Sequence, residues 1–232
     1  MTKPAPPPCD RLIFGGSFDP PHRGHLALLR YALEENLAPA VDLVPAAVSP
    51  FKTDAPPTPG ADRRRLLEAA LLDLADGADR VGETETRSGP PVDLARIQLR
   101  TIELDRPPPS YTVETCAELR RTYPGQTLGL LIGSDSLHDF DRWTRVEEIL
   151  KSHPIYVFRR TGDSPEATRR MIQDLTRRIA TRPATPPKFF ALANPLFPCS
   201  STDARGGVAE GGSVHCLTPR VARIITHLGL YQ

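Results

Sequence analysis

Apolar and polar positions follow one another in a regular order along most of the chain. The apolar run Arg11 to Gly16 ends in two glycines, and the leucines at 26, 29, 33 and 37 then fall on one face of a helix. A second run, Ala40 to Val44, predicts another strand. After a proline-broken loop at 45–60, the apolar spacing from Asp62 onward predicts the next helix. Strand, loop and helix therefore alternate.

The same alternation extends to the end of the chain. We predict further strands at 80–83, 98–104, 127–133, 154–159 and 188–193, and further helices at 112–122, 146–151, 164–180 and 219–228. Such an order predicts an α/β fold, a Rossmann-like doubly wound parallel sheet with helices on both faces. In these sheets ligands bind outside the carboxyl ends of the strands. The loops that leave the strands are therefore the places to look for chemistry.

Length and composition suit a single domain that follows a short N-terminal segment. The chain has 232 residues, of which 26 are proline, about twice the usual share. Residues 1–10 are proline-rich and have no apolar run, so we expect a disordered lead-in there and a single domain at 11–232. Because nothing resembles a signal peptide or a membrane span, we expect a cytoplasmic protein.

Charge and cysteine content exclude some classes of binding partner and of structural site. The 29 Lys and Arg residues nearly balance 28 Asp and Glu residues, for a formal net charge of +1. No overall field exists to hold a nucleic acid or a membrane, so neither is an expected partner, and any bound anion must be held locally. The four cysteines lie far apart without a C-x-x-C pair. We expect free thiols in a reducing compartment, and neither a disulfide scaffold nor a structural zinc site.

The loop after the first strand carries the strongest chemical signal. It begins with Gly15, Gly16, Ser17 and Phe18 and continues through Asp-Pro-Pro to His22-Arg-Gly-His25 at the start of the first helix. Paired glycines let backbone N–H groups approach an anion, and a helix N-terminus favours negative charge. The two imidazoles can point the same way, and Gly24 between them is expected to leave room for a ligand. Glycines alone would indicate a turn, and a histidine pair alone would indicate packing or a metal site.

These combined residues resemble the GGxFDPxHxGH signature of the nucleotidyltransferase superfamily, and specifically of bacterial nicotinate (nicotinamide) mononucleotide adenylyltransferases. The H-x-G-H part is shared with pantetheine-phosphate adenylyltransferases and cytidylyltransferases, so the loop alone leaves the substrate open. The resemblance covers Arg11 to the C-terminus, with the motifs in the family's order.

Several later motifs match the family's phosphate and sugar contacts. Lys52 keeps the family's lysine, although Phe51 replaces a histidine that is common beside it. Gly133 and Asp135 end a predicted strand as in the family's I-G-x-D, which implies contact with the nucleotide sugars; by themselves they would also suit a helix cap. Ser200, Thr202 and Arg205 match S-S-T-x-x-R, where hydroxyls cap a helix and the arginine forms a second anion site. Two glycines follow at 206 and 207, so we expect this helix to be short or mobile until ATP binds.

Other motifs match those with which the family binds the pyridine end of its substrate. Ser110-Tyr111-Thr112 resembles the S-Y-T motif, and a Ser or Thr here would first of all cap the helix that follows. The single tryptophan, Trp143, stands where the family places a ring that stacks on the pyridine, although a lone tryptophan is more often a core residue.

The resemblance implies an enzyme of NAD biosynthesis that transfers AMP from ATP to nicotinate mononucleotide, giving deamido-NAD and pyrophosphate. It assigns His22, His25, Lys52 and Arg205 to catalysis and Mg²⁺ to the ATP phosphates and water, with no protein metal site. Alternatives are a pantetheine-phosphate-type adenylyltransferase and a sensor that binds pyridine nucleotides without turnover. The preference for nicotinate over nicotinamide mononucleotide and the oligomeric state, a homo-oligomer included, stay open.

Overall fold

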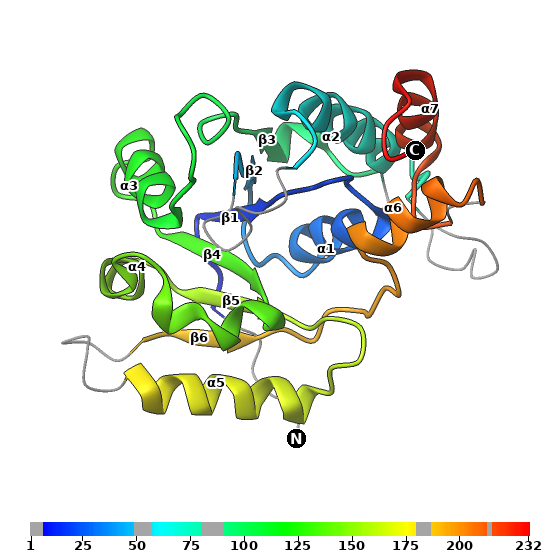
Figure 1. The fold of residues 1–232 in the computed structure, drawn as a ribbon. Coiled ribbons are helices and arrows are strands. Elements are labelled where there is room, and N and C mark those ends of the chain that lie inside the picture. Colours follow the sequence, from blue (N-terminus) through cyan, green and yellow to red (C-terminus); the bar gives the residue numbers. More distant parts are fainter. Residues whose placement is uncertain (1–6, 49–56, 80–90, 180–186, 213–214) are drawn as a thin grey trace.

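The computed structural model describes residues 7–48, 57–79, 91–179, 187–212 and 215–232, and within them six strands form one sheet (Figure 1). The strand order is β3-β2-β1-β4-β5-β6, and every neighbouring pair is parallel. The strands are β1 Arg11–Gly16, β2 Val41–Pro45, β3 Ile97–Leu99, β4 Leu128–Gly133, β5 Ile155–Phe158 and β6 Phe189–Ala191. The predicted α/β class with a parallel sheet is confirmed.

Helices connect the strands and cover both faces of the sheet (Figure 1). The α-helices are α1 Arg23–Glu34, α2 Gly60–Ala75, α3 Thr112–Thr122, α4 Val146–Ser152, α5 Pro165–Ile179, α6 Ser201–Ala209 and α7 Pro219–Leu228. Short 3-10 turns occur at Leu94–Arg96, Ser134–His138 and Phe140–Arg142. Predicted helices at 112–122 and 219–228 match the observed bounds of α3 and α7.

Alternate residues of the central strand β1 face two separate apolar clusters. Leu12 and Phe14 belong to a first cluster, which includes buried side chains of α1, α2 and α7. Ile13 between them belongs to a second cluster, formed with α3, α4 and α5. Because successive side chains of a strand point to opposite faces, this division shows a doubly wound sheet.

The strand order reverses at β1. From β1 the chain first builds outward through β2 and β3, then crosses to β4 on the other side of β1. The carboxyl ends of β1 and β4 therefore meet at a topological switch point, where open α/β sheets leave a crevice for ligands. Gly16 ends β1 and Gly133 ends β4 at this edge.

Two predicted strands are shorter than expected and a third cannot be compared. The strand predicted at 188–193 is observed as β6, Phe189–Ala191. The strand predicted at 98–104 ends at Leu99, because the chain then turns and the Asp105 N–H donates to the Thr101 carbonyl at 3.0 Å. Within the described residues, β3 is an edge strand of the sheet. The strand predicted at 80–83 lies outside the described residues.

The chain is already packed just before β1. Cys9 is buried, and its N–H donates to the Leu37 carbonyl at 3.0 Å. The Tyr156 hydroxyl donates to the Pro7 carbonyl at 2.6 Å. The packed region thus starts before Arg11; the division into a lead-in at 1–10 and a single domain at 11–232 stays a prediction.

The prediction that all four cysteines are free thiols is wrong for Cys199 and Cys216, which form a disulfide with Cα atoms 5.5 Å apart. They are 17 residues apart and form no pair motif; the chain returns after α6 and brings them together. Cys9 and Cys116 are free and buried.

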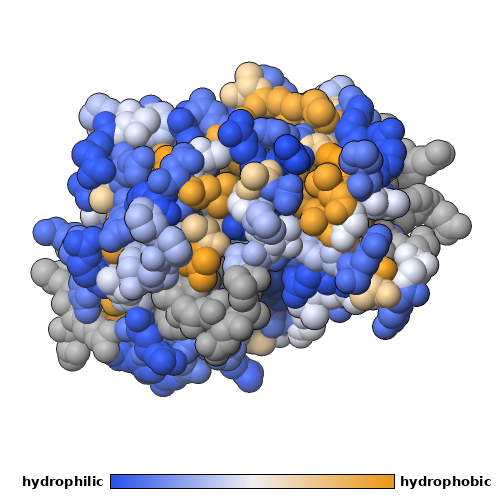
Figure 2. Space-filling view, turned by 45° about the horizontal axis from the view of Figure 1, so that its top comes forward, coloured by the Kyte–Doolittle hydropathy of each residue, from blue (hydrophilic) through white to orange (hydrophobic). Residues whose placement is uncertain are grey.

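The surface shown in Figure 2 has apolar side chains in separate patches between charged and polar ones. Among the described helices, none is long and apolar enough to cross a bilayer.

Candidate functional site

The loop between β1 and α1 places two imidazoles at the switch point. α1 begins at Arg23, so His22 stands at its N-cap and His25 in its first turn. Their ring centroids are 3.7 Å apart. The ring of His25 also packs on Phe18, with centroids 4.9 Å apart. Phe18 is buried and has a φ of +47°, a left-handed conformation in which a bulky residue is strained. The sharp turn that it makes directs the chain back toward the sheet edge.

A hydrogen bond fixes the tautomer of His25. The His22 backbone N–H donates to Nδ1 of His25 at 3.2 Å. Nδ1 must therefore carry the lone pair, and the neutral ring carries its proton on Nε2 as a donor. His22 is 4% exposed, and its Nδ1 is a buried nitrogen without a hydrogen-bond partner among the described residues. The His22 ring thus keeps a nitrogen that the described residues leave available to a ligand.

Both histidines are neutral near physiological pH. Burial, and then the positive charge of Arg160, lower the pKa of His22 to about 4. The loss of hydration, then His22, then Arg160, hold the pKa of His25 well below 6.5. The pair therefore offers N–H donors to an anion and brings no charge of its own.

Gly24 has a different purpose from the one predicted. A Cβ at this position would lie 3.0 Å from Cε1 and Nδ1 of His22. The space beside Gly24 is occupied by the His22 ring, so the glycine allows that ring to fold over the helix start. The expectation that Gly24 leaves room for a ligand is wrong.

Helix α6 lies beside the start of α1 (Figure 1), although almost 180 residues separate them. The Ser201 hydroxyl donates to the Pro20 carbonyl at 2.9 Å. Arg205 donates to the Asp19 carbonyl at 2.6 Å and lies 3.4 Å from Oγ1 of Thr202. The fold thus brings the S-S-T-x-x-R segment onto the loop that carries the histidines.

The predicted cap of α6 is confirmed. Ser200 is the N-cap residue, and its hydroxyl accepts the Asp203 N–H at 3.0 Å. The helix continues to Ala209 through both glycines. Thr202 and Asp203 in the first turn of the helix are exposed, and helix N-termini in general favour negative charge.

Asp19 connects the loop to the C-terminus, a role that sequence patterns did not reveal. The Thr58 N–H donates to one carboxylate oxygen at 3.1 Å, and the Tyr231 hydroxyl donates to the other at 2.6 Å. Burial, and then the bond to Asp19, raise the pKa of Tyr231. The buried carboxylate is thereby satisfied, and the loop is held from two sides.

Arg63 of α2 is a second residue that sequence analysis missed. It is 1% exposed and donates to the carbonyls of Ser17 at 2.7 Å, Ala46 at 2.6 Å, Thr58 at 2.7 Å and Ala47 at 3.2 Å. One guanidinium therefore joins the β1–α1 loop to the chain that leaves β2. Nothing in the sequence marks this arginine among its neighbours.

At the end of β4, Asp135 pairs with Arg160 from the chain after β5. The two carboxylate oxygens accept from Nε at 3.1 Å and from a terminal nitrogen at 2.9 Å. A Cβ on Gly133 would lie 2.2 Å from this carboxylate, so the glycine is required for the arrangement. Arg160 was not predicted, although its position directly after a predicted strand is the kind of place where site residues occur.

Tyr111, Thr112 and Trp143 border the other half of the sheet edge. Tyr111 and Trp143 pack against the second cluster, and the Trp143 ring lies 4.7 Å from that of Phe140. The expected helix cap by Ser110 or Thr112 is wrong: Tyr111 is the N-cap residue and its side chain makes no capping bond. The Ser110 hydroxyl instead accepts the Ala47 N–H at 3.1 Å and ties α3 to the chain after β2.

The predicted catalytic residue Lys52 lies outside the described residues.

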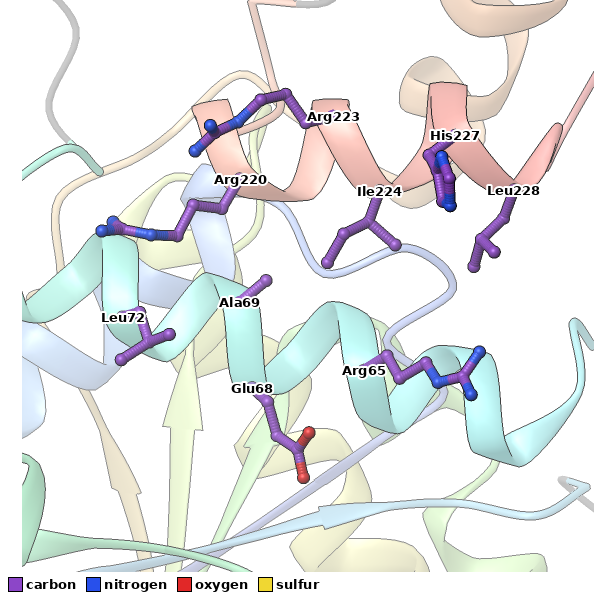
Figure 3. A pocket seen from close by; sticks show the side chains of 9 residues that line it. All are labelled: Arg65, Glu68, Ala69, Leu72, Arg220, Arg223, Ile224, His227 and Leu228. Atoms are coloured by element: carbon purple, nitrogen blue, oxygen red, sulfur yellow. The ribbon is translucent and has the colours of Figure 1, made fainter.

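The described residues also form a surface groove and a cysteine–histidine cluster, neither of which adds a binding group to this site. A surface groove between α2 and α7 (Figure 3) is lined by residues that include Leu72, Ile224 and Leu228, and by none of the predicted site residues. Donor atoms of Cys199, His215 and Cys216 lie within 4.8 Å of one another, but the two sulfurs are bonded to each other and so are not thiolate ligands.

Residues 13–207 match the cytidylyltransferase-like family. A protein of Pelodictyon phaeoclathratiforme is 34% identical over 222 residues, covering 94% of this chain and 90% of its own. One of Chlorobium luteolum is 35% identical over 221 residues, covering 95% and 97%. Both bear the name probable nicotinate-nucleotide adenylyltransferase.

The fold is also found among solved structures. The nicotinic acid mononucleotide adenylyltransferase of Plasmodium falciparum, complexed with NaAD, superposes with a TM-score of 0.69 at 17% identity, covering 95% of this chain and 96% of the other. At this identity the likeness concerns the fold.

Proposed function

The chain belongs to the cytidylyltransferase-like family, among the nicotinate-nucleotide adenylyltransferases, and from this premise we propose that it joins nicotinate mononucleotide to the AMP part of ATP. The products are deamido-NAD and pyrophosphate. The observation that carries the proposal is the meeting of the histidine loop with the Ser200–Arg205 segment at the switch point of the sheet. Two anion-binding helix starts converge there, as a triphosphate requires.

The reaction needs no covalent enzyme intermediate. A 5′-phosphate oxygen of the mononucleotide attacks the α-phosphorus of ATP in line, a new P–O bond forms, and the bond to the β-phosphate oxygen breaks. Pyrophosphate leaves with the electron pair. The protein contributes positioning and stabilisation of developing charge.

The neutral histidines suit the α-phosphate. His25 can donate from Nε2, since its Nδ1 accepts the His22 N–H. His22 keeps a buried ring nitrogen that has no hydrogen-bond partner in the described parts of the chain. A neutral donor near the reacting phosphorus stabilises charge as it develops without binding the ground state as strongly as a cation would.

Two described arginines, Arg205 and Arg160, bring positive charge close to the histidine loop. Arg205 and the hydroxyl of Thr202 on α6 are proposed to hold the outer phosphates together with Ser200 and the backbone from Gly15 to Phe18, and Lys52 is proposed to assist. Arg160 is added to the predicted set. Its pair with Asp135 has side chains 44% and 55% exposed, so exchanging this partner for a phosphate costs little. Asp135, with Gly133, is then available to accept from ribose hydroxyls.

The pyridine end is assigned to the second half of the edge. Backbone N–H groups at Tyr111 and Thr112 begin α3 and suit the carboxylate of nicotinate. Trp143 is proposed to stack on the ring, with Phe140 supporting its other side. This favours nicotinate over nicotinamide mononucleotide.

Mg²⁺ is proposed to arrive on the triphosphate and to neutralise charge on it. The nearby carboxylates have other partners: Asp19 accepts from Thr58 and Tyr231, and Asp135 is assigned to the ribose hydroxyls once Arg160 turns to a phosphate. This donor set fits an ion held mainly by phosphates and water.

A pyrophosphate-release assay tests the function. ATP is supplied with nicotinate mononucleotide, nicotinamide mononucleotide or phosphopantetheine. Release should be fastest with nicotinate mononucleotide. Turnover of phosphopantetheine alone would favour the pantetheine-phosphate-type enzyme, and binding without any release would favour the sensor.

A further inference from the structure

The Cys199–Cys216 disulfide closes the segment that contains α6. Cys199 directly precedes the N-cap of that helix, and Cys216 lies shortly before α7. Both cysteines are buried, at 9% and 2% exposure. The enclosed segment contains Gly206 and Gly207 within the helix, and glycines lower helix stability. The disulfide therefore restricts the conformational freedom of a segment whose glycines disfavour a stable helix.

Both ends of this closed segment contact the histidine loop. On one side, the Arg23 N–H donates to the Cys216 carbonyl at 2.8 Å, and Nε of Arg23 donates to the carbonyls of His215 at 2.9 Å and Leu217 at 3.1 Å. On the other side, Ser201 and Arg205 donate to the carbonyls of Pro20 and Asp19. The disulfide links the two ends of the segment that make these contacts.

We propose that Cys199 and Cys216 are a reversible oxidation site whose disulfide holds α6 against the β1–α1 loop and thereby strengthens ATP binding. The inference rests on the proposed function, because it needs α6 to contact the triphosphate. Cleavage of the bond leaves α6 held only by its hydrogen bonds and by the packing of Ala204 and Val208 on the first apolar cluster. More order must then be gained when ATP binds.

The exchange is balanced with a dithiol as reductant. A thiolate of the dithiol attacks one cysteine sulfur, the bond between the two cysteine sulfurs breaks, and a mixed disulfide forms. The second thiol of the reductant then displaces the first cysteine. Two electrons pass from the dithiol to the protein, each cysteine gains a proton, and the reductant becomes a disulfide.

The exposed ring of His215 is placed to assist this exchange. Its donor atom lies within 4.8 Å of both sulfurs. Through one bridging water, an imidazole at this distance reaches a departing thiolate and can supply the proton that it takes up. The ring is exposed, so it can exchange that proton with solvent.

The other two cysteines provide a matched control. Cys9 and Cys116 are free and buried in the two apolar clusters. Burial raises the pKa of Cys116 to about 12 and also raises that of Cys9, so both resist thiolate chemistry. Cys116→Ala should therefore respond to reductant as the wild type does.

The test compares the full-length protein before and after treatment with dithiothreitol. Alkylation under denaturing conditions, read by mass spectrometry, should find two reactive thiols in the oxidised protein and four in the reduced protein. Reduction should raise the KM for ATP by about five- to tenfold, a usual size for coupling between sites, and leave the KM for nicotinate mononucleotide nearly unchanged. Amide hydrogen exchange in α6 should accelerate. Reoxidation should reverse both effects.

Variants complete the test. Cys199→Ser and Cys216→Ser should each show the high KM for ATP of the reduced protein and no response to dithiothreitol. An unchanged KM for ATP on reduction, an equal rise for both substrates, or four reactive thiols after treatment with diamide would each overturn the proposal. Absence of AMP transfer in both redox states would count against the proposed function instead, since thiol counts and hydrogen exchange are read without turnover.

Discussion

Two substitutions of His25 distinguish the roles of its two ring nitrogens. Nδ1 accepts the His22 N–H, while Nε2 carries the proton that is available to substrate. Asparagine can place its amide oxygen near the position of Nδ1 but has no donor near Nε2. Glutamine can place a donor near Nε2 and loses the acceptor. His25→Asn should therefore preserve the local fold and remove the donor, whereas His25→Gln should do the reverse.

The expected loss follows from the chemistry of one preorganised donor. Removal of such a donor from developing charge usually lowers kcat by about 10²–10³, or roughly 3–4 kcal/mol of transition-state stabilisation. We expect His25→Asn to lower kcat/KM by at least about 10², and His25→Gln to recover a part of that loss. His25→Ala should lose at least as much as the asparagine variant, because it also removes the acceptor of the His22 N–H.

The assay is steady-state pyrophosphate release with nicotinate mononucleotide, accompanied by thermal unfolding of each variant. A loss of about tenfold or less for folded His25→Asn would remove His25 from the stabilisation of the α-phosphate. Equal activities of the asparagine and glutamine variants would refute the assignment of Nε2 as the donor.

Three other perturbations follow from the geometry. Trp143→Ala should raise the KM for nicotinate mononucleotide and leave that for ATP, with Trp143→Phe nearer the wild type; equal effects on both substrates would argue against stacking. Arg63→Leu leaves four carbonyls without their donor and should lower the free energy of unfolding, measured in urea, by at least about 3 kcal/mol. Arg63→Lys should recover part of this loss. A loss below about 1 kcal/mol for Arg63→Leu would contradict the linking role. His22 has a folded pKa of about 4 against the usual 6.5, so the unfolded chain takes up its proton first and stability should fall by roughly 3 kcal/mol as pH drops between those values. Urea unfolding across that range should show a shallower fall for His22→Gln, and parallel curves would show that His22 does not titrate on unfolding.

Local patterns succeeded where the structure is made by neighbours in sequence. The strand β4, the helices α3 and α7, and the cap of α6 by Ser200 all depend on residues within a few positions of one another. Ser110 shows the limit of such patterns. It precedes a helix as Ser200 does, yet its hydroxyl accepts the N–H of Ala47, 63 residues away. A partner from a distant element competes with the local cap, and the sequence does not show which one is nearer.

The cysteines show the same limit. Their separation along the chain suggested free thiols, but proximity is set by how the chain returns after α6. Gly24 is a related case, since the ring that fills the space beside it belongs to His22 and depends on a side-chain orientation. Arg63 and Arg160 were missed because burial and pairing, which distinguish them from the other arginines, exist only after folding.

By itself the sequence determined the alternation of strands and helices, the parallel α/β class, and the glycine, histidine and hydroxyl motifs that border the sheet edge, because each depends on periodicity or on short spacing. The tertiary structure decided which groups meet: Tyr231 reaches Asp19 across 212 positions, Arg205 reaches the same loop across 186, and Arg160 sets the charge around the histidines. These contacts fix the protonation and support of the site and arise from packing between distant elements, whereas the tautomer of His25 is set within the loop by the His22 N–H.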